Sequence, residues 1–538
     1  MTSRLHREGK AFLAAMLSLA LGAAGLAGCH RTAPPGNDSG GGTSVANPCG
    51  ALAPDKTSTL PMNPGGKQIE VDCSAWQSFI ALNWKGDPNQ LGYPDKSATW
   101  ADFGTPGDTT PKVWEGYLEA SGVFDPNTIL TGMWERKRPE IKSLVRISKF
   151  GKLDLSAITQ AGSGDHWLTN QRGDLTYYEV MMNRDEFQFI TTQKNFDLTT
   201  AKGQHDCATQ PGQPVSDGPP LKPPYPPGTV LRGGLNMPAG IGDGWDDTDC
   251  TGAIAHYGDG VGAMEIKAAW TPLPADHSLD YRYKTALAKI EDPATHRMRS
   301  VTVGLVGMHI IRKRFPRLPW VWATFEQIDN SPDEAANGGF NPPALPANAN
   351  RKPSPGFTFF NPVCDPKKDP TYQCKHNAPP VPCGTSGTVC DPYDKPMQIT
   401  RLNPVGATAN NVTAYVWGLF PAKSVFNYYR LVDVQWPQAA ISKNVPGPGI
   451  RVPLTMGNPT PVGSAGGTSQ IVANTTLESF QQSSNSCMDC HANFASIASP
   501  SLLQGTKPGA LRKVAKPGGA QAPYASDYSF IFLSETRR

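Results

Sequence analysis

A short stretch near the carboxyl terminus, SNSCMDCHANF at residues 484–494, carries the most specific chemical pattern of the chain. Cys487, Cys490 and His491 stand there in the order Cys-x-x-Cys-His. Two thiols at this spacing can each form a thioether with a vinyl group of haem, and the imidazole that follows can bind the iron. We therefore predict one covalent haem c, attached through Cys487 and Cys490, with His491 as the proximal iron ligand.

Two other uses of the cysteine pair compete with haem attachment. One is a redox dithiol beside an unrelated histidine, and the other is a structural disulfide across two residues. A redox dithiol usually follows a strand in a thioredoxin-like βαβ unit, and no such pattern precedes residue 487. The spacing thus favours haem attachment.

The motif resembles that of the c-type cytochromes, and this resemblance covers residues 471–538. The whole chain is also similar to bacterial "cytochrome c family" proteins, in which a large amino-terminal body precedes a terminal haem motif. The phrases that carry this similarity are AWQSFIALNW, EIKAAW, VGLVGMHI and WVWATFEQIDN. The resemblance implies single-electron transfer by a terminal haem, and it implies no substrate for the body.

The second axial ligand of the iron is where the chain departs from a small cytochrome c. In such domains a Met often follows the pentad, whereas neither Met nor His follows His491 here. The ligand therefore comes from upstream, or the position is open or filled by a weaker group. Upstream candidates are Met456, His309, His256 and Met308. Because a buried His usually has ordinary hydrogen-bond partners and Met commonly fills core gaps, the sequence assigns none of them.

The amino terminus predicts export and lipid anchoring. A basic head precedes the apolar run AFLAAMLSLALGAAGLAG at residues 11–28, as in a secretory signal. A transmembrane anchor is the alternative, but the run is short and ends in small residues. LAGC at residues 26–29 resembles the lipobox of bacterial lipoproteins, which implies that Cys29 becomes the acylated first residue. We expect the protein in the bacterial cell envelope, facing the periplasm or exterior and held to the outer membrane.

Composition divides the chain into four parts. Residues 1–28 are the signal peptide, and residues 29–48, rich in Gly, Ser and Pro, form a flexible tether. Residues 49–470 form a β-rich body, and residues 471–538 form a short, mainly helical haem segment. The expected fold class is therefore α+β.

The charge balance argues against a nucleic-acid partner. The net charge is +3, charged residues make up 18% of the chain, and no basic run with interleaved aromatic residues occurs. The 54 Gly and 52 Pro indicate many loops, while 12 Trp and 20 Phe supply a large core. The chain is thus expected to be globular and rich in loops.

Disulfides are expected in an exported chain of this kind. Of 11 cysteines, Cys29 is assigned to lipid and Cys487 and Cys490 to haem, which leaves an even number. Nearest-neighbour closure would pair Cys49 with Cys73, Cys207 with Cys250, Cys364 with Cys374, and Cys383 with Cys390, although sequence alone fixes no pairing. A four-cysteine zinc site at residues 364–390 is the weaker alternative, because its cysteine gaps are too long.

Hydrophobic patterning predicts the elements that must position these residues. A helix is expected over residues 72–84, with Asp72 as its cap, and a capping box from Asn183 to Glu186 is expected to open a second helix. Strands are expected at 175–183, 264–270 (half-buried), 301–311 (central), 320–330, 414–420 and 426–436, and a helix at 474–482.

Two other motifs are given structural interpretations. The acidic stretch at residues 240–252 imitates a calcium loop, but its ligand set is incomplete, so a solvated turn is favoured. Glu326 and Asp329 suit a functional pair of carboxylates, and a strand-end turn explains them at least as well.

Three functions fit this sequence. The favoured function is electron transfer by a monohaem cytochrome that docks with a redox partner protein. The second is a haem enzyme, peroxidase-like or oxygenase-like, whose body binds an unknown small molecule. The third is a haem-based sensor of a ligand or redox state. All three place the protein at a membrane surface through its lipid anchor.

Overall fold

The computed structural model divides the chain into two compact units, Met1–Thr43 and Ser44–Arg538. All described residues belong to the second unit. They are residues 46–61, 67–144, 167–210, 235–241, 246–291, 297–313, 320–346, 356–364, 374–379, 395–437, 461–462, 471–483, 487, 491, 497 and 526–532. Within these ranges, no helix combines the length and apolar character that a membrane span requires. The predicted signal peptide, the tether up to residue 45, Cys29, Met456 and Cys490 lie outside them.

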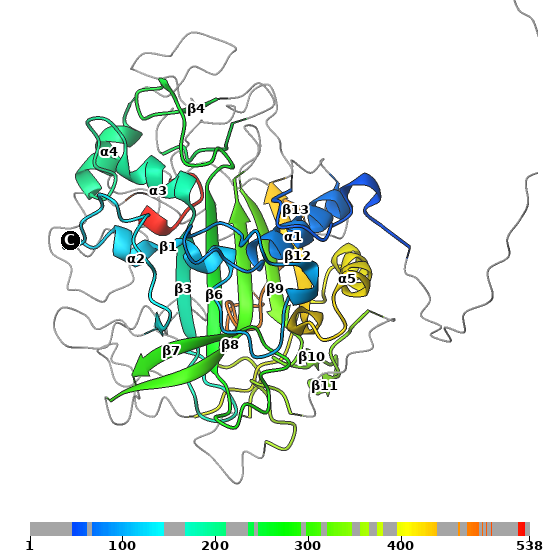
Figure 1. The fold of residues 1–538 in the computed structure, drawn as a ribbon. Helices are drawn as coiled ribbons and strands as arrows, with labels where there is room; N and C mark the ends of the chain where they lie inside the picture. Colours follow the sequence, from blue (N-terminus) through cyan, green and yellow to red (C-terminus); the bar gives the residue numbers. More distant parts are fainter. Residues whose placement is uncertain are drawn as a thin grey trace, which may run out of the picture. The chain divides into compact units, whose positions relative to one another are not determined.

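A curled, mixed β-sheet forms the centre of the second unit (Figure 1). Its main path runs β1-β3-β6-β8-β9-β12-β13 through antiparallel pairs, while β7 pairs with the first half of β8 and β2 pairs with β7 in parallel. The strands are β1 (Leu118–Glu119), β2 (Lys142–Ser143), β3 (Tyr177–Met182), β6 (Met264–Pro272), β7 (Thr285–Glu291), β8 (Met298–Arg312), β9 (Val321–Gln327), β12 (Tyr429–Pro437) and β13 (Pro461–Val462). Two small pairs lie apart from this sheet, β4 (Asp247–Thr248) with β5 (Ile254–Ala255) and β10 (Asp333–Glu334) with β11 (Phe340–Asn341).

Helices pack around the sheet. The α-helices are α1 (Gln68–Leu82), α2 (Ala120–Val123), α3 (Arg184–Thr191), α4 (Ala201–Ala208) and α5 (Ala407–Leu419), and the 3-10 helices are η1 (Gly50–Leu52), η2 (Trp100–Asp102), η3 (Val113–Gly116) and η5 (Val425–Tyr428). α1 and α5 contact each other and β12. From α1, the rings of Trp76 and Phe79 lie 5.0 and 4.5 Å from that of Phe325 on β9. One face of the sheet is therefore covered by an apolar, aromatic core.

The opposite face of the sheet carries a polar region beside a second apolar cluster, which includes Tyr178, Ala269 and Leu477. Residues that pair directly across antiparallel strands point to the same side. The register aligns Lys267, His309 and Thr324 in one row across β6, β8 and β9. We call the polar region the polar face; it comprises Glu265, Lys267, His309, Trp322, Thr324, Glu326 and Arg430.

Several predicted elements are confirmed with small shifts. The strands expected at 175–183, 264–270, 301–311, 320–330 and 426–436 correspond to β3, β6, β8, β9 and β12. The 301–311 strand is central, as expected, because β8 has neighbours along both edges. The Asn183 side chain accepts a hydrogen bond from the Glu186 amide and caps α3, although no return bond from the Glu186 carboxyl is present.

Other predictions are wrong. Residues 414–420 belong mostly to α5, and residues 475–483 form turns in place of a helix. The strand at 264–270 is buried on both sides, because later parts of the chain cover its polar residues. α1 begins at Gln68, so Asp72 is a fully buried interior residue and not the helix cap.

Three of the predicted disulfides are present. Cys49 is bonded to Cys73, Cys207 to Cys250, and Cys364 to Cys374. The last bond removes two of the four cysteines that a zinc site at 364–390 would need. Cys383 and Cys390 lie outside the described residues.

Candidate functional site

The predicted haem motif lies against the body of the protein. Of its three residues, Cys487 and His491 are described; both have helical backbone and both are partly buried. Cys487 packs against the main hydrophobic core. In a continuous helix, positions four apart share one face, which is the arrangement that attachment of a haem at this motif requires.

The ring of His491 is enclosed by aromatic side chains. Its centroid lies 5.3 Å from the ring of Trp322 on the polar face and 4.6 Å from the ring of Phe530. Its Nδ1 lies 2.6 Å from the backbone carbonyl oxygen of Tyr528. Because a carbonyl oxygen only accepts hydrogen bonds, Nδ1 carries the proton and Nε2 keeps its lone pair.

Burial also keeps this imidazole neutral. Together with the nearby positive charge of Lys267, and against the effect of the Tyr528 carbonyl, burial lowers the pKa of His491 to about 4. At neutral pH the ring is thus an uncharged nitrogen donor with a defined tautomer. This is the form in which histidine binds metals, with its second nitrogen held by a hydrogen bond.

The turn that contains Tyr528 is fixed to the body by its two neighbours. Asp527 forms a buried ion pair with Lys313 and accepts a hydrogen bond from the Met237 amide at 2.8 Å. Ser529 Oγ donates a hydrogen bond to the buried carboxylate of Glu265 on the polar face. The carbonyl that orients His491 is therefore held in place from both sides.

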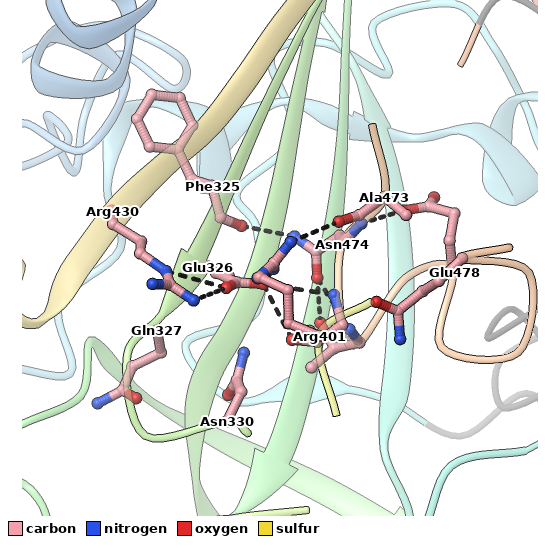
Figure 2. Close-up of polar contacts among 12 residues, drawn as sticks. Phe325, Glu326, Gln327, Asn330, Arg401, Arg430, Ala473, Asn474 and Glu478 are labelled. Atoms are coloured by element: carbon pink, nitrogen blue, oxygen red, sulfur yellow. Dashed lines mark hydrogen bonds and ion pairs between the residues drawn. The ribbon is translucent and has the colours of Figure 1, made fainter. Parts of the chain in front are cut away.

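The chain that leads into the motif is anchored to the polar face by Glu326 (Figure 2). Its carboxylate contacts two arginines, Arg430 at 2.8 Å and Arg401, and accepts a hydrogen bond from Thr475 Oγ1 at 2.9 Å. Arg401 in turn donates to the carbonyl of Ala473 at 3.1 Å. Residues 473–475 are thus tied to the sheet by a buried charged network.

The charge of Glu326 is maintained despite its burial. The side chain is 1% exposed, and burial by itself would raise the pKa. Arg401 and Arg430 outweigh that effect and lower the pKa to about 2. Next to this network, Asn474 Nδ2 donates to the carbonyl of Phe325 at 2.7 Å (Figure 2).

His309, one of the candidate second ligands, lies on the same polar face. It is 6% exposed, and its Nε2 lies 3.4 Å from Glu478 Oε2. This contact is long for a hydrogen bond, and Nε2 has no hydrogen-bond partner in the described part of the chain. Met308 points into the apolar core on the other side, and His256 is exposed.

The described residues fit a covalently held haem. A cysteine and a neutral imidazole lie four positions apart in the chain, aromatic rings surround the imidazole, and a buried histidine nitrogen on the polar face lacks a hydrogen-bond partner among the described residues. Within the described ranges, no three His, Cys, Asp or Glu side chains are grouped so as to hold a metal ion by themselves.

The other motifs have structural roles. Asp249 accepts hydrogen bonds from Thr251 and from the Ala253 amide, so the stretch at 240–252 contains the expected turn. Asp329 is paired with Arg282 at 2.6 Å.

The sequence did not identify Arg401, Arg430, Tyr528 or Trp322 as parts of the site. No local pattern marks them, because each acts through a partner far along the chain.

Comparison with known proteins adds no relative: no family model, no curated protein and no solved structure matches this chain.

Proposed function

We propose that this protein is an exported, lipid-anchored monohaem c-type cytochrome that passes single electrons to or from a redox partner. The observation that carries the proposal is the state of His491. Its Nδ1 is committed to the Tyr528 carbonyl, and its buried ring is neutral. A histidine in this state, directly after a Cys-x-x-Cys pair, is ready to bind the iron of an attached haem.

Haem, when bound, supplies an iron that takes up and releases one electron. Cys487 and Cys490 would hold it through thioethers, and His491 would bind the iron through Nε2. Trp322 and Phe530 pack on the imidazole and shield part of it from water. Reduced access of water changes the reduction potential of a haem iron, and a rigid site reduces the structural rearrangement that accompanies electron transfer.

The body contributes rigidity to this proposed site. Glu326 fixes the chain before the motif, and Ser529 fixes the turn after it. Acyl chains on Cys29 would hold the assembly at a membrane surface in the bacterial envelope. We expect the redox partner to be a protein of the same compartment, and no nucleic acid to be involved.

The test is mass spectrometry of the mature protein produced together with a c-type cytochrome maturation system. We expect ~616 Da of added mass on the peptide that carries both thiols, as covalent porphyrin attachment requires. A Cys487→Ala, Cys490→Ala double variant should lose that mass, while Met488→Ala, which leaves the three motif residues intact, should keep it.

A wild-type protein without the added mass would refute the proposal. Haem that adds to the peptide but shows no reversible one-electron reduction would refute electron transfer and leave the enzyme or sensor function in its place.

A further inference from the structure

The polar face brings a second histidine close to His491. Trp322, whose ring contacts His491, pairs with Ile311 on β8. His309 is two residues before Ile311 on the same strand and therefore lies on the same side, diagonal to Trp322. Side chains in such diagonal positions are close enough for long or aromatic groups to touch.

The imidazole of His309 is available for a ligand. It is almost fully buried, and its Nε2 has no hydrogen-bond partner within the described ranges. A buried polar atom without a partner is costly, so native structures rarely retain one without a reason. Coordination to a metal would satisfy this nitrogen.

We infer that Nε2 of His309 is the second axial ligand of the haem iron bound by His491. This inference rests on the proposed haem attachment. The same Nε2 lies 3.4 Å from Glu478 Oε2, so the Glu478 carboxylate would have to turn away from His309 as the iron binds. The proposed ligand thus comes from the sheet and not from the segment that carries the motif.

Two other side chains of the polar side are weaker candidates. Lys267 is half-buried and pairs directly with His309, but an amine is protonated at neutral pH and has no lone pair for iron. Met182 points to the same side from β3. β6 and β8 separate it from β9, which carries the Trp322 ring against His491. His309 is therefore the donor that the described residues favour.

This assignment gives the large body a role in the redox chemistry. The last part of the chain carries the proximal ligand, and the body carries the distal one. An iron with two imidazole ligands has no open position, so electron transfer is favoured over binding of oxygen, peroxide or carbon monoxide.

The experiment compares visible absorption spectra of the holoprotein and its His309→Ala variant, with and without carbon monoxide. We expect the wild type to be low-spin and inert to carbon monoxide. The variant should keep its covalent haem mass, become high-spin and bind carbon monoxide stoichiometrically, and added imidazole should restore the low-spin spectrum. His277→Ala, which removes an exposed histidine, and Lys267→Ala should both remain low-spin.

A His309→Ala protein that retains its haem and stays low-spin would overturn the inference and leave the proposed function intact. If that variant does not fold, near-infrared magnetic circular dichroism of the wild type decides, because it distinguishes two imidazoles from imidazole with an amine or a thioether. Any pair other than two imidazoles overturns the inference. A wild type without covalent haem overturns both proposals.

Discussion

The imidazole Nδ1 of His491 and the carbonyl oxygen of Tyr528 lie 2.6 Å apart, although 37 positions separate the two residues in the chain. The last described residues, 526–532, therefore return to His491 and pack against it. Asp527 and Ser529 attach these residues to the body through contacts that do not involve the motif. The orientation of His491 thus depends on contacts that the motif itself does not make.

Ser529→Ala should loosen this turn. The hydroxyl donates to Glu265 and accepts a hydrogen bond from the Ile531 amide at 3.1 Å. Its loss leaves buried groups without partners, which costs about 1–3 kcal/mol of unfolding free energy. Urea denaturation measures the loss, and hydrogen exchange should quicken first at residues 526–532. Ser97→Ala, which removes an exposed hydroxyl, should change neither; equal effects of the two substitutions would contradict the prediction.

Glu326→Gln should be the most damaging single substitution in the anchor of residues 473–475. It keeps the shape of the side chain but removes the counter-charge of buried Arg401 and leaves buried Arg430 with only Asp333, at 4.0 Å. Breaking a buried ion pair in this way costs about 3–5 kcal/mol, measurable by urea denaturation at pH 7. Glu140→Gln, at the exposed pair with Lys137, is the control and should leave the midpoint unchanged.

The same variant should alter acid stability. Glu326 has its pKa lowered to about 2 in the folded protein, against about 4.3 in an unfolded chain. Its contribution to stability is therefore full above pH 4.3 and is lost as pH falls toward 2. Glu326→Gln should lack this part of the acid-induced loss. Parallel stability curves for wild type and variant between pH 4.5 and about 2 would contradict the assignment.

Gly307→Ala should push residues 474–476, which precede the motif, away from the sheet. A Cβ at Gly307 would lie 2.2 Å from Thr476 Oγ1 and 2.9 Å from Asn474 Oδ1. Overpacking of this kind costs about 1–3 kcal/mol, and the shift should reach residues 474–476. Gly418→Ala, on an exposed position of α5 with nothing within 4 Å of the added Cβ, should be neutral or slightly stabilising. Denaturation midpoints that move together would refute the account.

How much of this fold the sequence predicts depends on how local the signal is. β8 and β9 were identified from long apolar runs rich in β-branched and aromatic residues. The run AYVWGLF has a similar composition but forms the end of α5, because a short apolar run suits a buried helix equally well. The half-buried pattern of β6 was misleading since distant residues cover its polar side, and no local pattern shows that.

The candidate site shows the same division. The spacing of Cys487, Cys490 and His491 is local, so it could be recognised directly. The partners of His491 come from β9 and from residues 528–530, and only the fold brings them together. Sequence could name His309 as a candidate ligand, but it could not tell that His309 shares a face with Trp322 while Met308 faces the core.

Removal of each disulfide should lower the free energy of unfolding, and the loss should be larger for a disulfide that closes a longer loop. The pairs Cys207–Cys250, Cys49–Cys73 and Cys364–Cys374 have sequence separations of 43, 24 and 10. Loop-closure entropy then gives losses of ~4, ~3.5 and ~2.7 kcal/mol for the paired Cys→Ser variants. Denaturation of the three double variants tests this order, and a largest loss for the shortest loop would refute it.

Asp72→Asn should change how stability depends on pH. Burial raises the pKa of Asp72 to about 8, and the charge of Asp433 adds to this effect. In an unfolded chain the group titrates near pH 3.9, so the unfolded state loses its proton first as pH rises. Its contribution to stability is full below that value and declines, by up to about 1.4 kcal/mol per pH unit, until pH passes about 8.

Asparagine does not ionise, and its carbonyl can still accept the hydrogen bond that Gln68 Nε2 donates at 2.9 Å. Urea denaturation between about pH 5 and 8 should therefore show a flatter profile for the variant, which becomes the more stable protein at the alkaline end. Other carboxyls with raised pKa, such as Glu265, are present in both proteins and cancel in the difference. A variant whose profile stays parallel to that of the wild type would show that Asp72 is ionised in the folded protein, with a cation or other partner that balances its charge.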